Sequence, residues 1–420
     1  LAWHFEEVDF EVPRAVYLQA AVAADWFKGG WSATWESTGG PQQLSGGKGW
    51  DAAAAGLVPG VTVNGGTMTQ LMLNYLAAGF RGFGFWCWNA RSAGWEAGEY
   101  ALLDRNEQAG ERAIAAGRIG QACQRWREEL WQARKEPLVG LFHDFDNEIM
   151  WAAIAQQGRD QFRHFGVRAR VGAGRALING NLPFEHLSSR DLRQGLGPRY
   201  PIIYLSGIVT LHRDWLAWLT DFVRRGGRLV MDAPSAWVDE YGRYLQSQVG
   251  SPFEQLFGCH LRDMQFARNQ PRQLAGVPLE TFAMDLQPTH ARVLASFADG
   301  LPAVTEARLG SGTAVLLAWD AGMGCFKAGQ PARETLLRRY LLGSHQAPFA
   351  CADALVYRRT APLADHWFLI NDGAARTVAL DPVTSTRQAT WRDAVSDEPV
   401  TPHAIALPAH SGRWLRAAHD

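Results

Sequence analysis

Acidic side chains follow two short apolar segments near the start of the chain. In residues 31–41, WSATWESTGGP, Glu36 separates a Trp-flanked run from a turn of Ser, Thr, Gly and Pro. Glu96 and Glu99 follow a second apolar segment, FRGFGFWCWN, at residues 80–89. A carboxylate at a strand end can be the nucleophile of a retaining glycosidase, about 5–5.5 Å from a second carboxyl group. An ordinary solvated glutamate at a strand end is the alternative for Glu36.

Tryptophans gather around these carboxylates. Many of the 18 tryptophans lie in or near the first 131 residues. Aromatic rings commonly face sugars, but Trp is also a large core residue. We interpret Trp86 as core packing and Trp88 as facing a sugar. Arg91 either lines the same pocket or caps the loop.

Composition limits the classes of function. A chain of 420 residues predicts two or three domains. A net charge of -1 gives no electrostatic reason to expect nucleic acid or a membrane surface as partner, and no apolar run approaches the roughly 20 residues of a membrane helix. The five cysteines form no C-x-x-C pair, which favours free thiols in a reducing, cytoplasmic compartment over a zinc site.

The first region alternates helices with strands. Residues 12–27 have helical spacing after Pro13, and residues 67–78 predict a second helix that stops at Gly79. Strands are expected at 31–35 and 80–89. This order is typical of a parallel α/β unit, and in a β/α barrel both strands would end on the catalytic face.

The pattern changes twice further along the chain. From Lys135 onward, alternating strands and helices predict a doubly wound domain, with strands in 137–142, 200–207, 228–234 and 310–320 and helices in 212–227 and 332–343. Beyond about residue 350, short alternating segments such as HWFLIND and RTVALD predict a small β-sandwich.

The order of these pieces, and several of their motifs, resemble the C-terminal two-thirds of glycoside hydrolase family 42 β-galactosidases, from near the end of the sixth barrel strand. The motifs are TWESTGGP, GTMTQLMLNYLAAGFRGFGFWCWNARSAGWEAGEYALLD, PLVGLFHDFDNEIMWAA, FVRRGGRLVMDAPSAWVDEYGR and LPAVTEARLGSGTAVLLAWD. The resemblance implies the C-terminal part of a (β/α)8 barrel at 1–134, an amidotransferase-like assembly domain at 135–348 and a small β-sandwich at 349–420. It also implies a homotrimer.

The resemblance assigns roles to individual residues. Glu36 becomes the nucleophile, Trp88 the aromatic floor under the sugar, and Glu96 a ligand for sugar hydroxyls. The family usually has a Trp soon after the nucleophile, where this chain has Leu44 and its nearest Trp is Trp50. Glu99 replaces a family His, so galactose is a default expectation for the sugar. Two carboxylates suffice for this chemistry, and no cofactor is expected.

The acid/base glutamate is not expected on this chain. The family carries it after an Asn at the end of the fourth barrel strand, whereas Asn147 and Glu148 belong to the assembly-domain segment and are interpreted as helix-capping or subunit-contact residues. We therefore expect the first six barrel strands on a separate polypeptide or on a longer enzyme. A non-catalytic carbohydrate-binding or assembly subunit, or a hydrolase of another β-glycoside, is the alternative. Glutaminase chemistry is not expected, because Ser206 stands where a Cys nucleophile would be needed.

Overall fold

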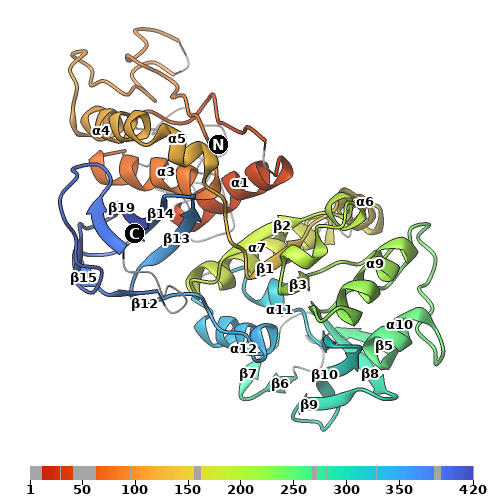
Figure 1. The fold of residues 1–420 in the computed structure, drawn as a ribbon. Coiled ribbons are helices and arrows are strands. Elements are labelled where there is room, and N and C mark those ends of the chain that lie inside the picture. The colour runs from red at the N-terminus through yellow and green to blue at the C-terminus, as the bar shows by residue number, and fades with distance from the viewer. Residues whose placement is uncertain are drawn as a thin grey trace. The chain divides into compact units, whose positions relative to one another are not determined.

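The computed structural model describes residues 12–28, 30–40, 63–94, 96–155, 162–266, 272–279, 282–327, 329–382 and 389–419 (Figure 1). Contacts divide the chain into two compact units. Unit 1 combines Leu1–Glu136 with Ala347–Asp420, and unit 2 is Pro137–Gln346. Unit 1 therefore contains both the segment expected in a barrel and the segment expected to form a sandwich.

The helices of unit 1 include both helices that the sequence predicts. They are α1 (Val12–Trp26), α3 (Gly65–Ala78), α4 (Glu111–Arg125) and α5 (Arg127–Gln132). The Asn64 side chain accepts a hydrogen bond from the Thr67 N–H at the start of α3. Gly79 ends α3 with φ +113°, a left-handed conformation that glycine adopts at little cost. Most of α3 is buried, and it packs against α1 and α4.

The two expected strands around Glu36 and Trp86 run parallel, but only isolated bridges join them. Thr34 pairs with Phe83, and Thr38 pairs with Trp86. The Trp86 N–H donates to the Ser37 carbonyl at 2.7 Å. The chain therefore keeps the parallel arrangement that the sequence predicts, without a continuous strand in either described segment.

The C-terminal part of unit 1 is a small β structure. Its strands are β12 (Ala350–Cys351), β13 (Leu355–Thr360), β14 (Ala364–Asn371), β15 (Arg376–Val378), β16 (Leu380–Asp381), β17 (Ala389–Asp393), β18 (Ile405–Leu407) and β19 (Ser411–His419). Four of them form an antiparallel sheet in the order β13-β14-β19-β17, and β12–β16 and β15–β18 form two-stranded pairs. A core that includes Phe349, Trp367, Val378 and Leu415 joins these strands. Helix α3 packs against β14 and β19.

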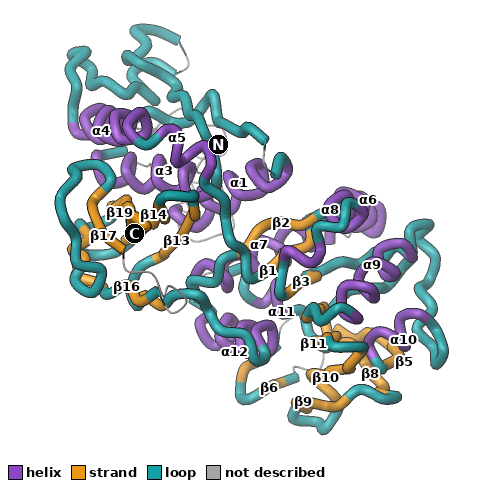
Figure 2. The backbone as a smooth tube through the Cα atoms, in the orientation of Figure 1, coloured by secondary structure: helices purple, strands orange, loops and turns teal. Residues whose placement is uncertain are grey.

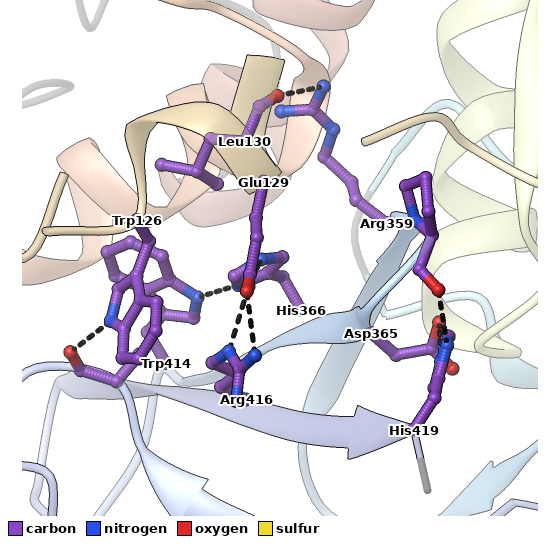
Figure 3. A network of polar contacts seen from close by, with 11 residues as sticks. Trp126, Glu129, Leu130, Arg359, Asp365, His366, Trp414, Arg416 and His419 are labelled. Atoms are coloured by element: carbon purple, nitrogen blue, oxygen red, sulfur yellow. Dashed lines mark hydrogen bonds and ion pairs between the residues drawn. The ribbon is translucent and has the colours of Figure 1, made fainter. Parts of the chain in front are cut away.

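Buried polar contacts fix α5 on this sheet (Figure 3). Arg416 on β19 donates to both carboxylate oxygens of Glu129 on α5, at 2.8 and 2.7 Å. His366 Nε2 on β14 lies 3.1 Å from the same carboxylate, and its Nδ1 accepts from the Trp414 indole N–H at 3.1 Å. Arg359 on β13 donates to the Ala133 carbonyl just beyond α5. These contacts tie residues far apart in sequence into one unit.

Unit 2 is a three-layer α/β unit (Figure 2). The strands of its main sheet are β1 (Val139–Phe142), β2 (Phe184–Leu187), β3 (Ile202–Leu205), β4 (Arg228–Met231), β9 (Arg292–Ser296), β10 (Pro302–Leu309) and β11 (Gly312–Leu317). They lie in the order β2-β1-β3-β4-β11-β10-β9, parallel from β2 to β11 and antiparallel from β11 to β9. The inner strands are buried on both faces, as their continuous apolar runs predict.

Helices lie on both faces of this sheet. They are α6 (Phe145–Ile154), α7 (Phe165–Asn179), α8 (Ser189–Arg193), a 3-10 turn (Gly197–Arg199), α9 (Arg213–Arg224), α10 (Pro252–Phe257), α11 (Ala321–Gly324) and α12 (Pro331–Leu342). Helices α7, α11 and α12 pack together on one face, and α9 and α10 pack on the other (Figure 1). Outside the main sheet, β5 (Cys259–Phe266) pairs with β8 (Phe282–Pro288), and β6 (Gln273–Leu274) pairs with β7 (Val277–Pro278). The expected α/β class with a parallel sheet is thus confirmed.

Candidate functional site

Glu36 lies on the exposed side of a segment that its neighbours anchor. The Thr34 hydroxyl donates to the Glu36 carbonyl at 2.9 Å. The next side chain, Ser37, is buried, and its hydroxyl lies 2.7 Å from the hydroxyl of Tyr75 on α3. Burial raises the pKa of Tyr75 to about 12, so this is a bond between neutral hydroxyl groups. Helix α3 thereby fixes the backbone next to Glu36.

Trp86, Arg91 and Glu96 form a cluster next to this segment. The Trp86 indole N–H donates to Glu96 Oε2 at 2.9 Å, and Arg91 Nη1 lies 3.3 Å from the same oxygen. The Arg91 guanidinium also lies 5.9 Å from the centre of the Trp86 ring. The Trp86 side chain is 41% exposed, so its assignment to core packing was wrong. It is instead a hydrogen-bond donor to one of the predicted site carboxylates.

Sequence reasoning missed Trp86 although a signal was present. Trp86 and Trp88 are two residues apart, and in extended chain such side chains lie on the same side. Both are exposed, Trp88 to 66%. The spacing therefore predicts similar exposure for the two residues.

The other predicted site residues lie in different settings. Glu99 is 6% exposed, whereas the Glu96 side chain is 29% exposed, so the two acids do not share one environment. Trp50, predicted to bind substrate, and Leu44 lie outside the described residues.

Two glycines allow the turn after Glu36 to meet the loop that follows Glu99. A Cβ at Gly40 would lie 2.1 Å from the Ala101 carbonyl oxygen, and one at Gly39 would lie 2.8 Å from that of Tyr100. The Gly39 N–H donates to the Trp86 carbonyl at 3.0 Å. Only residues without a side chain permit this approach. The Gly-Gly pair thus allows the turn after Glu36 to pack closely against the segment that contains Glu96.

Polar residues at the start of α6, the segment that contains Asn147 and Glu148, have structural partners. Asp144 caps α6, since its carboxylate accepts from the Asp146 N–H at 3.1 Å. Asn147 is buried and bonds to the backbone of Gly207 and Val209. Across the described residues, His, Cys, Asp and Glu side chains form no group of three or more suited to a metal ion. No helix in that part of the chain has the length and apolar character needed to cross a membrane.

Comparison with known proteins identifies part of unit 2. Residues 194–341 match the family model of the beta-galactosidase trimerisation domain. A comparison with curated proteins gives no match.

Solved structures resemble the whole chain. A catalytic mutant of Gan42B, a GH42 beta-galactosidase from G. stearothermophilus, is 17% identical, with a TM-score of 0.78 over 100% of this chain and 58% of its own. The cold-adapted beta-galactosidase from Rahnella sp. R3 is 17% identical, with a TM-score of 0.73 over 99% of this chain and 59% of its own. Alpha-L-fucosidase isoenzyme 2 from Paenibacillus thiaminolyticus is 13% identical, with a TM-score of 0.59 over 85% of this chain and 57% of its own.

The chain thus spans 58% of the length of Gan42B. At such low identity the likeness establishes the fold, and fold alone does not fix activity. The trimerisation-domain match and the fold together confirm the resemblance drawn from the sequence: residues 194–341 match a beta-galactosidase trimerisation domain, and the chain as a whole has the fold seen in GH42 β-galactosidases.

Proposed function

We propose that this chain is part of a retaining glycoside hydrolase that cleaves terminal β-D-galactosides, and that Glu36 is its nucleophile. The observation that carries the proposal is the position of Glu36. Glu36 is an exposed residue on a segment that pairs in parallel with the Trp86 segment, and Trp86 contacts Glu96, which Arg91 also approaches.

Each group has a chemical role in this proposal. Glu36 attacks the anomeric carbon, and the glycosyl-enzyme formed is released by water in the second step. Glu96 accepts hydrogen bonds from sugar hydroxyl groups, and the exposed ring of Trp88 stacks on the sugar. The acid/base carboxyl group is supplied by the first six barrel strands, on a separate polypeptide or on a longer form of the enzyme. Residues before 135 form the C-terminal part of the barrel, and the protein assembles as a homotrimer.

A hydrolase of a different glycoside is the second candidate. The fold similarity to an alpha-L-fucosidase supports this second candidate, because the same fold can act on more than one sugar. Glu99, in place of a family His, also alters the polar groups close to the site, although its side chain is buried.

The direct kinetic test compares wild type with Glu36→Gln in the native assembly, on a panel of aryl β-glycosides that includes the β-galactoside. The amide cannot attack, so turnover should fall at least about 10³-fold while the oligomer mass stays the same. Unchanged turnover in the variant would rule out Glu36 as the nucleophile. If wild type prefers another glycoside and Glu36→Gln loses turnover of that glycoside, Glu36 remains the proposed nucleophile, but the substrate is not a galactoside.

A further inference from the structure

Three arginines of unit 1 lie close together although they come from distant parts of the chain. Arg81 follows α3, Arg134 follows α5, and Arg359 lies on β13. The backbones of Arg134 and Thr360 exchange two hydrogen bonds, at 2.9 and 2.8 Å, which place Arg134 beside the end of β13. The Arg81 guanidinium lies 4.2 Å from the centre of the Trp131 ring, and Arg134 Nη1 donates to the Trp131 carbonyl at 2.8 Å. We call Arg81, Arg134 and Arg359 the arginine cluster.

Arg359 is the buried member of the arginine cluster, at 3% exposed. Its Nη1 donates to the Leu76 carbonyl at 3.2 Å, and its Nη2 donates to the Ala133 carbonyl at 2.7 Å. Figure 3 shows Nη2 directed also at the Leu130 carbonyl, 3.5 Å away. Its Nε is buried and has no hydrogen-bond partner among the described residues. Buried donors normally have a partner, so this Nε–H is a donor to which a ligand can bind.

Arg81 and Arg134 add further unused donors. The Nε of Arg81 is also buried without a hydrogen-bond partner in the described part of the chain. Arg134 is exposed, and its Nη1 donates to the carbonyls of Trp131 and Ala133. These two carbonyls are neutral, so they leave the Arg134 charge uncompensated. The Trp131 side chain is 51% exposed, so the cluster has an open side next to this ring.

No carboxylate balances these charges within the residues that the structure describes. The acids held close to this part of the chain bind other cations, since Asp25 pairs with Lys135 and Glu136 pairs with Arg358. The arginine cluster therefore has three positive charges whose hydrogen-bond acceptors in the described residues are all backbone carbonyls.

The like charges of the cluster act on one another. Burial and the charge of Arg134 lower the pKa of Arg81. Burial, together with the charges of Arg81 and Arg134, lowers the pKa of Arg359 to about 10. An anion placed among the three guanidinium groups would offset this repulsion and accept hydrogen bonds from the unused donors.

We propose that the arginine cluster is a binding site for an oxyanion, namely a phosphate or carboxylate group. Guanidinium groups match the oxygen spacing of such groups and bind them with charge-assisted hydrogen bonds. Arg359 forms the buried floor of the site, Arg81 supplies a second buried Nε–H, and Arg134 lies at the open side. The oxyanion is either a dissolved ion or a carboxylate side chain from elsewhere in the native assembly.

The arginine cluster lies at the opposite end of the two paired segments from Glu36. The Arg81 N–H donates to the Ser32 carbonyl at 2.8 Å, near the start of both segments. Thr38 pairs with Trp86 near their ends, two residues beyond Glu36. An anion in the cluster is therefore separate from the proposed nucleophile, and the inference does not depend on the proposed reaction.

The test is isothermal titration calorimetry of the native assembly with inorganic phosphate, with the ionic strength held constant by sodium chloride. We expect wild type to bind phosphate, and a dissociation constant at least about tenfold higher for Arg81→Gln and Arg134→Gln, because each loses a charged donor. Arg118→Gln, at an exposed arginine on α4 in the same unit, is the matched control and should bind like wild type. Arg359 is left unchanged because its bonds to backbone carbonyls support the fold.

Thermal unfolding without phosphate distinguishes the two sources of the oxyanion. If a carboxylate side chain of the assembly occupies the site, wild type does not bind phosphate. Arg81→Gln and Arg134→Gln then lower the unfolding midpoint more than Arg118→Gln does, and this difference shrinks in about 1 M sodium chloride because salt screens an ion pair. That result keeps the oxyanion site and assigns its occupant to the protein.

Two results would overturn the site. One is phosphate binding with the same dissociation constant in wild type, Arg81→Gln and Arg134→Gln. The other is a wild type that does not bind phosphate, together with no salt-dependent difference in midpoint between these variants and Arg118→Gln. Neither result depends on the activity of Glu36.

Discussion

The indole N–H of Trp86 donates to Glu96 Oε2 at 2.9 Å, and Arg91 approaches the same oxygen at 3.3 Å. Both donors converge on one carboxylate oxygen. In the proposed site the other oxygen, Oε1, is therefore the acceptor for a sugar hydroxyl, and Trp86 acts as a positioning residue for Glu96.

Replacing Trp86 by Phe should weaken substrate recognition without unfolding unit 1. Phe keeps a ring but removes the donor, so the Glu96 carboxylate loses one of its two fixed contacts. Loss of a hydrogen bond to a charged group corresponds to about a 10- to 100-fold fall in kcat/KM on the preferred aryl glycoside. Trp131→Phe, on α5 beneath Arg81, is the control and should change kcat/KM little. Equal kinetics for Trp86→Phe and wild type would show that the contact does not serve the reaction.

The bond between Ser37 and Tyr75 should matter for the position of Glu36. Tyr75→Phe leaves the buried Ser37 hydroxyl without this partner, which we expect to cost about 1 kcal/mol in urea unfolding. Because Ser37 adjoins Glu36, kcat should fall while KM changes little. Ser37→Ala combined with Tyr75→Phe should cost less than the sum of the single changes. Additive losses would mean that the two hydroxyls are not coupled.

Glu129 should be a principal stabilising residue of unit 1. Burial alone raises its pKa, but hydrogen bonds and charge from His366 and Arg416 outweigh this effect and hold the pKa of Glu129 at about 2. Glu129→Gln leaves Arg416 without a carboxylate and should lower the free energy of unfolding at pH 7 by about 2–3 kcal/mol. Glu128→Gln is the matched control, because Glu128 and its partner Arg127 are exposed. A loss of the same size in both variants would contradict the role of the Glu129 contacts.

The same cluster predicts how stability depends on pH. Burial lowers the pKa of His366 below its usual value of about 6.5, so the folded state binds fewer protons than the unfolded state as the pH falls below 6.5. Stability is then present above about pH 6.5 and declines on acidification. The lowered pKa of Glu129 adds a further decline from about pH 4 toward 2. Urea unfolding measured in steps from pH 7.5 to 4.5 should show a smaller decline in the free energy of unfolding for His366→Gln than for wild type. Equal declines in the two proteins would exclude His366 as a cause of the pH dependence.

Local patterns predicted several elements because local physics determines them. Helix α3 follows from its apolar run and from Gly79, whose left-handed conformation ends it. The strands of unit 2 follow from short continuous apolar segments, which are typical of a parallel sheet buried on both faces.

Features that depend on distant partners could not be predicted in this way. The hydrogen bond from Trp86 to Glu96 is one of them, because Glu96 reaches the indole only after the intervening loop folds back. Unit 1 combines an N-terminal and a C-terminal segment of the chain. This combination depends on pairs such as Glu129 with Arg416, which are 287 residues apart in the sequence. The roles of Glu36, Trp88, Glu96, Glu99, Trp50 and Arg91 in catalysis or binding remain predictions.

The most direct test of the central claim is covalent trapping. The native assembly is incubated with an aryl 2-deoxy-2-fluoro-β-D-galactoside, which slows release of a glycosyl-enzyme, and the protein is then digested and mapped by mass spectrometry. We predict one labelled peptide, modified at Glu36, and no label in Glu36→Gln. A label on another carboxylate, or turnover of aryl β-galactosides with no label at Glu36, would contradict the assignment.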